Sequence, residues 1–157
     1  MIAWLLSICF LLGFVTGLRS LTAPAVVCWA ARLGWLHFAG TRLAFIDRPT
    51  TLIIFTLLAF AELIVDKLPN APARTDLPGL VARIVFGGLC GVSLATSVGG
   101  NLLVAAIIGV IGAIVGTFIG YRIRRHLVVQ AHLPDSGVAL AEDLIAIGGS
   151  LLIVSHL

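Results

Sequence analysis

The sequence has very little charge. Only 11% of its 157 residues are Asp, Glu, Lys or Arg, against roughly 25% in a typical soluble domain. So few charged side chains cannot cover a surface that faces water. Hydrophobic residues make up 60% of the chain and the mean hydropathy is +1.15. They fall into blocks close to the ~20 residues that a bilayer-spanning helix needs. The composition therefore excludes a water-soluble domain and predicts an integral membrane protein.

The sequence also lacks the motifs of common catalytic and metal sites. It contains no G-x-S-x-G, no H-E-x-x-H and no phosphate-binding loop. Cys9, Cys28 and Cys90 lie in apolar blocks without CxxC or Cys/His spacing, which indicates buried apolar side chains. We predict no enzymatic activity, no metal and no cofactor. A lipid-modifying enzyme that uses Arg and His at the cytoplasmic face is the alternative.

The apolar blocks predict an all-α, polytopic membrane protein of about six transmembrane helices in one domain, residues 1–157. The expected helices cover residues 2–18, 21–41, 50–68, 79–96 and 101–121, and a last helix ends at Ser155. The most polar stretch, residues 69–78, separates the third helix from the fourth.

Lys and Arg residues are distributed unequally between the two sides of these helices. With both termini outside, the cytoplasmic side holds six of them and the opposite side holds two, Arg42 and Arg48. The six are Arg19, Lys67, Arg74, Arg122, Arg124 and Arg125. The positive-inside rule therefore predicts both termini outside. The net charge of +3 is explained by these headgroup-facing residues, and no nucleic-acid partner is expected.

Two short motifs recur at one spacing. F-x-G-x-R occurs at residues 38–42 and 118–122, and A-x-A-E occurs at 59–62 and 139–142, both at an offset of 80. A three-helix unit repeated in tandem enters the membrane from opposite sides. The offset thus predicts an inverted repeat, with units of about 1–77 and 78–157. Many secondary transporters have this architecture. Channels also contain inverted repeats, and coincidence is the alternative explanation.

Several ionisable residues fall within or beside the expected helices and are candidates for a ligand or ion site. Glu62 and Glu142 are equivalent in the repeat, and Asp66 follows Glu62 by one turn on the same face. Arg32 falls near the centre of the second expected helix, where Glu62 or Asp66 is its natural partner. A structural ion pair that holds helices together is the alternative role.

Two glycine-containing turns complete the set of candidates. Arg19 lies in the turn at residues 17–20, and Asn101 ends the equivalent turn at 97–101. Such breaks beside a helix N-terminus present backbone N–H groups to an anion. They also serve as plain tight turns between helices.

Small residues recur every fourth position in two expected helices, at Gly87 and Gly91 and at Gly112, Gly116 and Gly120. Such stripes let helices approach closely in lipid. We predict that they pack inside one chain. A seam between two chains, and hence a homodimer, is the alternative.

Three segments carry a resemblance to a known family. They are G-L-R at residues 17–19, E-L-I-V-D-K-L-P at 62–69 and E-D-L at 142–144. In these the chain resembles an uncharacterised family of small bacterial integral membrane proteins with G-x-R, E-x-x-x-D-K-[IL]-P and E-D-L segments. The proline that often follows the G-x-R turn comes five residues later here, at Pro24. The resemblance implies a bacterial inner membrane location and supplies no activity.

Together these features predict a small inner-membrane transporter or channel with a polar intramembrane centre built on Glu62 and Glu142. Its expected partners are membrane lipids and an unidentified small solute or ion. The alternative is a structural or assembly membrane protein whose buried charges only hold helices together.

The charge distribution generates a topology prediction. Reporter fusions after Ala73 and after Arg125 should both indicate the cytoplasm, and a fusion at Leu157 should indicate the periplasm. Reporters on opposite sides for the first two fusions would rule out the six-helix arrangement and the inverted repeat with it.

Overall fold

A computed structural model describes residues 2–67 and 76–157 of the chain. Within these residues the protein is all helical, as predicted. Its elements are α1 (Ile2–Leu18), α2 (Thr22–Arg32), α3 (Pro49–Val65), α4 (Leu77–Val98), α5 (Leu102–Arg125), the π-helical turn η1 (His126–Gln130) and α6 (Asp135–Ser155). The expected helix end at residue 68, Pro69, Ala73 and Arg74 lie outside the described residues.

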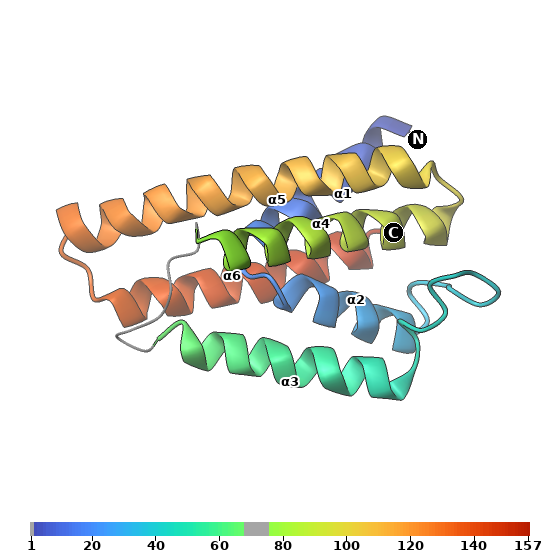
Figure 1. Ribbon diagram of the computed structural model, residues 1–157, viewed down its shortest axis with the longest axis horizontal. Helices are drawn as coiled ribbons and strands as arrows, with labels where there is room; N and C mark the ends of the chain where they lie inside the picture. Colours follow the sequence, from blue (N-terminus) through green and yellow to red (C-terminus); the bar gives the residue numbers. More distant parts are fainter. Residues whose placement is uncertain (1, 68–75) are drawn as a thin grey trace.

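The helices lie side by side along the long axis of the molecule (Figure 1). Helix α1 packs against α4 and α5, which also pack against each other. Helix α2 contacts α1, α3, α4 and α6 and is therefore central. Both chain ends lie at the same end of the bundle as the 33–48 segment (Figure 1). The α1–α2 turn and the first residues of α4 and α6 lie toward the opposite end.

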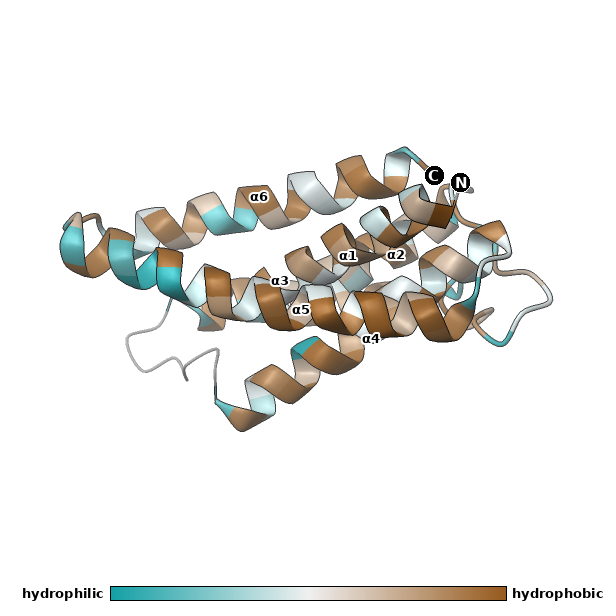
Figure 2. Cartoon of the chain, turned by 90° about the horizontal axis from the view of Figure 1, so that it is seen from above, coloured by the Kyte–Doolittle hydropathy of each residue, from teal (hydrophilic) through white to brown (hydrophobic). Residues whose placement is uncertain are grey.

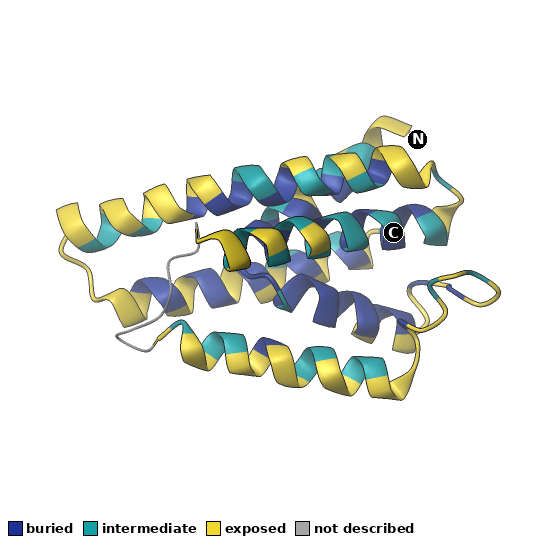
Figure 3. Ribbon diagram, in the orientation of Figure 1, coloured by how far each residue is buried: buried dark blue, intermediate teal, exposed yellow. Residues whose placement is uncertain are grey.

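The outer surface of the bundle is apolar. Leu57, Leu103, Leu144 and Leu152 are more than half exposed, and hydrophobic stretches follow the exposed faces of the helices (Figures 2 and 3). Within residues 2–67 and 76–157, three helical segments are long and apolar enough to cross a membrane: Leu77–Val98, Leu102–Gln130 and Asp135–Ser155. The protein is therefore a membrane protein whose exposed leucines face lipid instead of water.

The second expected span is shorter than the sequence indicated. We expected a helix over residues 21–41, but α2 has 11 residues and ends at Arg32. It therefore extends about 16 Å, half the ~30 Å of a hydrocarbon core. The cause is Gly34, whose φ is +79°. Gly34 N donates to Ala31 O and Trp35 N donates to Ala30 O, which is the Schellman pattern of a glycine-terminated helix.

The backbones of α1, α4 and α5 approach each other through glycine. A Cβ atom added to Gly109 would collide with the Gly87 carbonyl of α4, and one added to Gly116 would collide with the Phe14 carbonyl of α1. Gly13 of α1 and Gly91 of α4 face α5 in the same way. These small residues pack within one chain, and at these positions the backbones of the three helices come into direct contact.

The structure does not confirm the inverted repeat. Residues 38–42 belong to the irregular segment after α2, whereas 118–122 lie inside α5. Helix α3 begins at Pro49, but residue 129 at the 80-residue offset lies in η1, and α6 begins at Asp135. The boundaries of α3 and α6, which would be equivalent in the repeat, therefore do not differ by 80 residues.

The close glycine contacts predict a difference between two alanine variants. Gly116→Ala should lower the free energy of unfolding by about 1–3 kcal/mol, because its methyl group overpacks the contact with Phe14. Gly148→Ala is the matched control in α6, since a Cβ atom there meets nothing within 4 Å. Denaturant titration in mixed micelles measures both. Equal stability of the two variants would contradict the packing described for α1 and α5.

Candidate functional site

A buried arginine lies where the first helix turns into the second. Arg19 follows α1 directly, and its side chain is 0% exposed. Its Nη1 pairs with Asp66 Oδ2, and its Nη2 lies 2.5 Å from Asp143 Oδ1. Asp66 is the C-cap of α3 and Asp143 belongs to α6. Because a buried charge needs compensation, Arg19 connects the α1–α2 turn to both helices.

Asp143 is shared between two cations. Its Oδ2 lies 2.8 Å from Lys67 Nζ, and Asp143 itself is only 4% exposed. Lys67 is partly exposed and Arg19 is not. Asp143 therefore joins a buried positive charge to one that reaches the surface.

Glu62 holds the turn that leads into α2. Its Oε1 accepts hydrogen bonds from Ser20 N at 2.8 Å and Ser20 Oγ at 2.5 Å. Its Oε2 accepts from Leu21 N at 2.9 Å. The first N–H groups of a helix have no partner within the helix, and they carry a partial positive charge. The Glu62 carboxylate, which comes from α3, therefore holds the beginning of α2 in place.

Arg124 binds two further carboxylates near the end of α5. Its Nε and Nη2 each lie 2.8 Å from an oxygen of Asp135, a bidentate pair, and its Nη1 lies 3.4 Å from Glu142 Oε2. Its Nη2 is also 3.5 Å from the backbone oxygen of Asp66. Arg124 thus connects α5 to α6 and to the end of α3. We name the whole group the Arg19 cluster: Arg19, Glu62, Asp66, Lys67, Arg124, Asp135, Glu142 and Asp143.

The cluster brings together four of the six residues that the sequence singled out. Arg19, Glu62, Asp66 and Glu142 all belong to it. Glu62 lies one turn before the end of α3, and Glu142 lies in the third turn of α6. The polar intramembrane centre built on Glu62 and Glu142 stays a prediction, and the charges that the structure brings together lie toward one end of the bundle. Figure 2 shows hydrophilic stretches of α5 and α6 at that end.

The other two candidates lie elsewhere. Arg32 is the last residue of α2 and is exposed, so its expected place near a helix centre is wrong. Its expected partners, Glu62 and Asp66, contact the α1–α2 turn instead. Asn101 is the N-cap of α5, where its Oδ1 accepts from Val104 N at 3.1 Å. Asn101 therefore serves as a helix cap, at the end of α5 opposite to Arg124.

The sequence did not single out four further residues of this region: Arg83, Arg124, Asp135 and Asp143. Arg83 is 5% exposed in α4, and its Nε donates to Gly17 O at 3.1 Å while Nη1 donates to Gly79 O. It supports the residues just before Arg19. A lone arginine inside an apolar block was the available signal for Arg83. For Asp143 the signal was an acidic residue inside the last expected helix, whereas Asp135 lies at the start of that helix and gave none.

The fold and the cluster define a class: an all-α membrane protein with three candidate spans and a charged cluster near one end. The chain matches the family described as "Domain of unknown function (DUF4126)" over residues 6–156 and belongs to it. This confirms the resemblance to an uncharacterised family. No curated protein and no solved structure matches the chain.

Burial of Arg19 generates a stability prediction. Arg19→Leu should destabilise the protein by about 3–5 kcal/mol, because it removes the cation between two carboxylates in a site with little water. Arg32→Leu is the matched control, since Arg32 is exposed and should change stability little. Unfolding in mixed micelles measures both. A loss for Arg19→Leu no larger than for Arg32→Leu would show that the ion pairs of Arg19 do not stabilise the fold.

Proposed function

We propose that the protein is a small, non-enzymatic transporter of the bacterial inner membrane. In this proposal the Arg19 cluster binds and releases a proton while α2 changes position. The observation that supports the proposal best is the pairing of a half-length central helix with a charged cluster at its N-terminus. Discontinuous helices that end at polar sites are typical of secondary transporters.

The length and burial of α2 favour movement over a purely structural role. A helix of 11 residues does not span the bilayer, yet nine of its residues are buried among the other helices. A protein that needed only stable packing would be served by a full-length apolar helix in this place. Buried ion pairs also contribute little net stability when compared with apolar side chains.

Glu62 couples charge to the position of α2. Protonation of the Glu62 carboxyl group would weaken the hydrogen bonds it accepts from Ser20 N and Leu21 N, because a neutral acceptor binds N–H groups less strongly. The two protonation states of Glu62 would therefore favour different positions of α2.

The rest of the bundle supplies a rigid part against which α2 can move. Helices α1, α4 and α5 meet through glycine contacts between backbones, whereas α2 contacts its neighbours α3 and α6 through side chains such as Trp29, whose Nε1 donates to Thr56 Oγ1 at 3.1 Å. Dense backbone contacts leave little freedom, and side-chain contacts rearrange more easily.

A structural or assembly role is the second candidate. It is favoured by the cluster itself, in which Arg19, Glu62, Lys67 and Arg124 all have partners. Under this hypothesis the charges fix the relative positions of α3, α5 and α6, and no proton moves.

Proton flux into vesicles distinguishes the two candidates. Purified protein is placed in liposomes that contain a pH-sensitive dye, and a potassium gradient with valinomycin drives proton entry. Wild-type vesicles should acidify faster than protein-free vesicles. Glu62→Gln should reduce the rate to that of protein-free vesicles, because an amide cannot exchange the proton.

The matched control is Asp47→Asn, which makes the same type of change at an exposed residue in the 33–48 segment and should leave the rate unchanged. Melting temperatures in detergent verify that the variants are folded. Equal rates for wild-type and protein-free vesicles would exclude proton transport and leave the structural role.

A further inference from the structure

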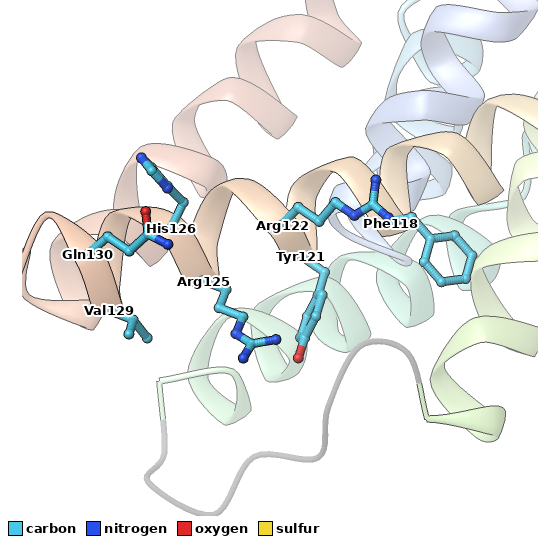
Figure 4. Close-up of a pocket in the computed structure, with 7 residues that line it drawn as sticks. All are labelled: Phe118, Tyr121, Arg122, Arg125, His126, Val129 and Gln130. Carbon is cyan, nitrogen blue, oxygen red and sulfur yellow. The ribbon is translucent and has the colours of Figure 1, made fainter.

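A groove of about 650 Å³ runs along the outer face of α5 and η1. Two rows of side chains from this one helical segment line it, each with a spacing of four residues. One row contains Tyr121, Arg125 and Val129, and the other continues from Phe118 and Arg122 to His126 and Gln130. Figure 4 shows Tyr121 and Arg125 on one side of the helix and His126 on the other. The groove is therefore lined by two arginines, a histidine, a tyrosine and a glutamine, with Phe118 and Val129 as its apolar side chains.

The two arginines of the groove differ from the arginine between them. Arg124 is held by Asp135 and Glu142. Arg122 and Arg125 are exposed, and within residues 2–67 and 76–157 their side chains make no hydrogen bond or ion pair. Arginine side chains with free planar donors bind carboxylates and phosphates well. The groove thus carries two positive charges that the described fold does not use.

The length of α5 sets the depth of these residues in the bilayer. Its 24 residues extend about 36 Å, more than the ~30 Å of the hydrocarbon core. If Leu102 lies at one boundary of the core, Tyr121 lies at the other, since 20 residues cover about 30 Å. Arg122, Arg125 and His126 then lie in the headgroup layer, and Tyr121 takes the interfacial position that tyrosine favours.

We propose that this groove binds the headgroup phosphate of an anionic phospholipid of the surrounding membrane. Arg122 and Arg125 contact the phosphate from the two rows, and the Tyr121 hydroxyl, on the same side of the helix as Arg125, provides a further donor. Phe118 lies one turn deeper and contacts the start of an acyl chain. The site is independent of the Arg19 cluster and of proton transport.

Charge and position together select a lipid as the occupant. The groove is at the same end of the bundle as Lys67 and Arg19, the side that the positive-inside rule assigns to the cytoplasm. Anionic lipids give the cytoplasmic leaflet a negative surface, and basic pockets at this level bind their headgroups. A soluble phosphate ester would not use the apolar side chains Phe118 and Val129, which line the same groove.

The test is lipid binding to the purified protein in mild detergent, measured by native mass spectrometry. Wild-type protein should bind phosphatidylglycerol about 30-fold more tightly than phosphatidylcholine, as about fivefold per basic residue is expected at an anionic headgroup. Arg122→Gln/Arg125→Gln should lose this preference. Arg42→Gln/Arg48→Gln removes the same charge from exposed residues at the other end of the bundle and should retain it.

Three outcomes would overturn the proposal. Wild-type protein without a preference for phosphatidylglycerol would exclude an anionic-lipid site altogether. An equal loss in both double variants would show that net charge, and not the groove, determines binding. Displacement of phosphatidylglycerol by equimolar inorganic phosphate or glycerol phosphate would assign the groove to a soluble anion. The wild-type measurement needs no variant, so a folding defect in a variant cannot hide the answer.

Discussion

Arg19 is a buried cation in a protein whose outer surface is apolar, and this constraint orders the charged end of the bundle. A guanidinium group without water must find carboxylates, and the residues next to it in sequence provide none. Asp66 and Asp143 come from the end of α3 and from α6. Both helices must therefore lie beside the α1–α2 turn. Glu62, one turn before Asp66, then reaches the backbone N–H groups of Ser20 and Leu21, just before α2.

The two halves of the bundle are held by different forces. Helices α1, α4 and α5 approach through glycine, where dispersion between close backbones replaces the hydrophobic effect that lipid does not provide. Helices α2, α3 and α6 are joined near one end by charge. Ion pairs respond to protonation and backbone contacts do not. If the protein changes conformation in response to protons, the charged half is where the change begins.

Arginines on one turn of α5 have two different environments, the interior of the bundle and its outer face. Arg124 faces inward to Asp135 and Glu142, whereas Arg122 and Arg125 face the groove on the outside. Because successive residues of a helix point about 100° apart, one basic segment serves both the interior and the headgroup layer. The sequence R-I-R-R-H indicates an interfacial segment but does not distinguish these uses.

The membrane environment, the all-α fold and five of the six helix positions, to within a few residues, could be predicted from composition and apolar block length, which are local properties of the chain. The family could be predicted from the resemblance of three short segments. The sequence also singled out Arg19, Glu62, Asp66 and Glu142, which the structure places in the Arg19 cluster. Their partners became known only from the tertiary structure. The structure also placed Arg32, the candidate expected near a helix centre, at the exposed end of α2. The helix that should have contained Arg32 at its centre ends there, because Gly34 takes a left-handed conformation and Schellman hydrogen bonds close α2. Arg19 and Asp143 lie far apart in the sequence, one after α1 and the other in α6. Their contact depends on how the helices pack, and no local pattern of residues specifies that packing.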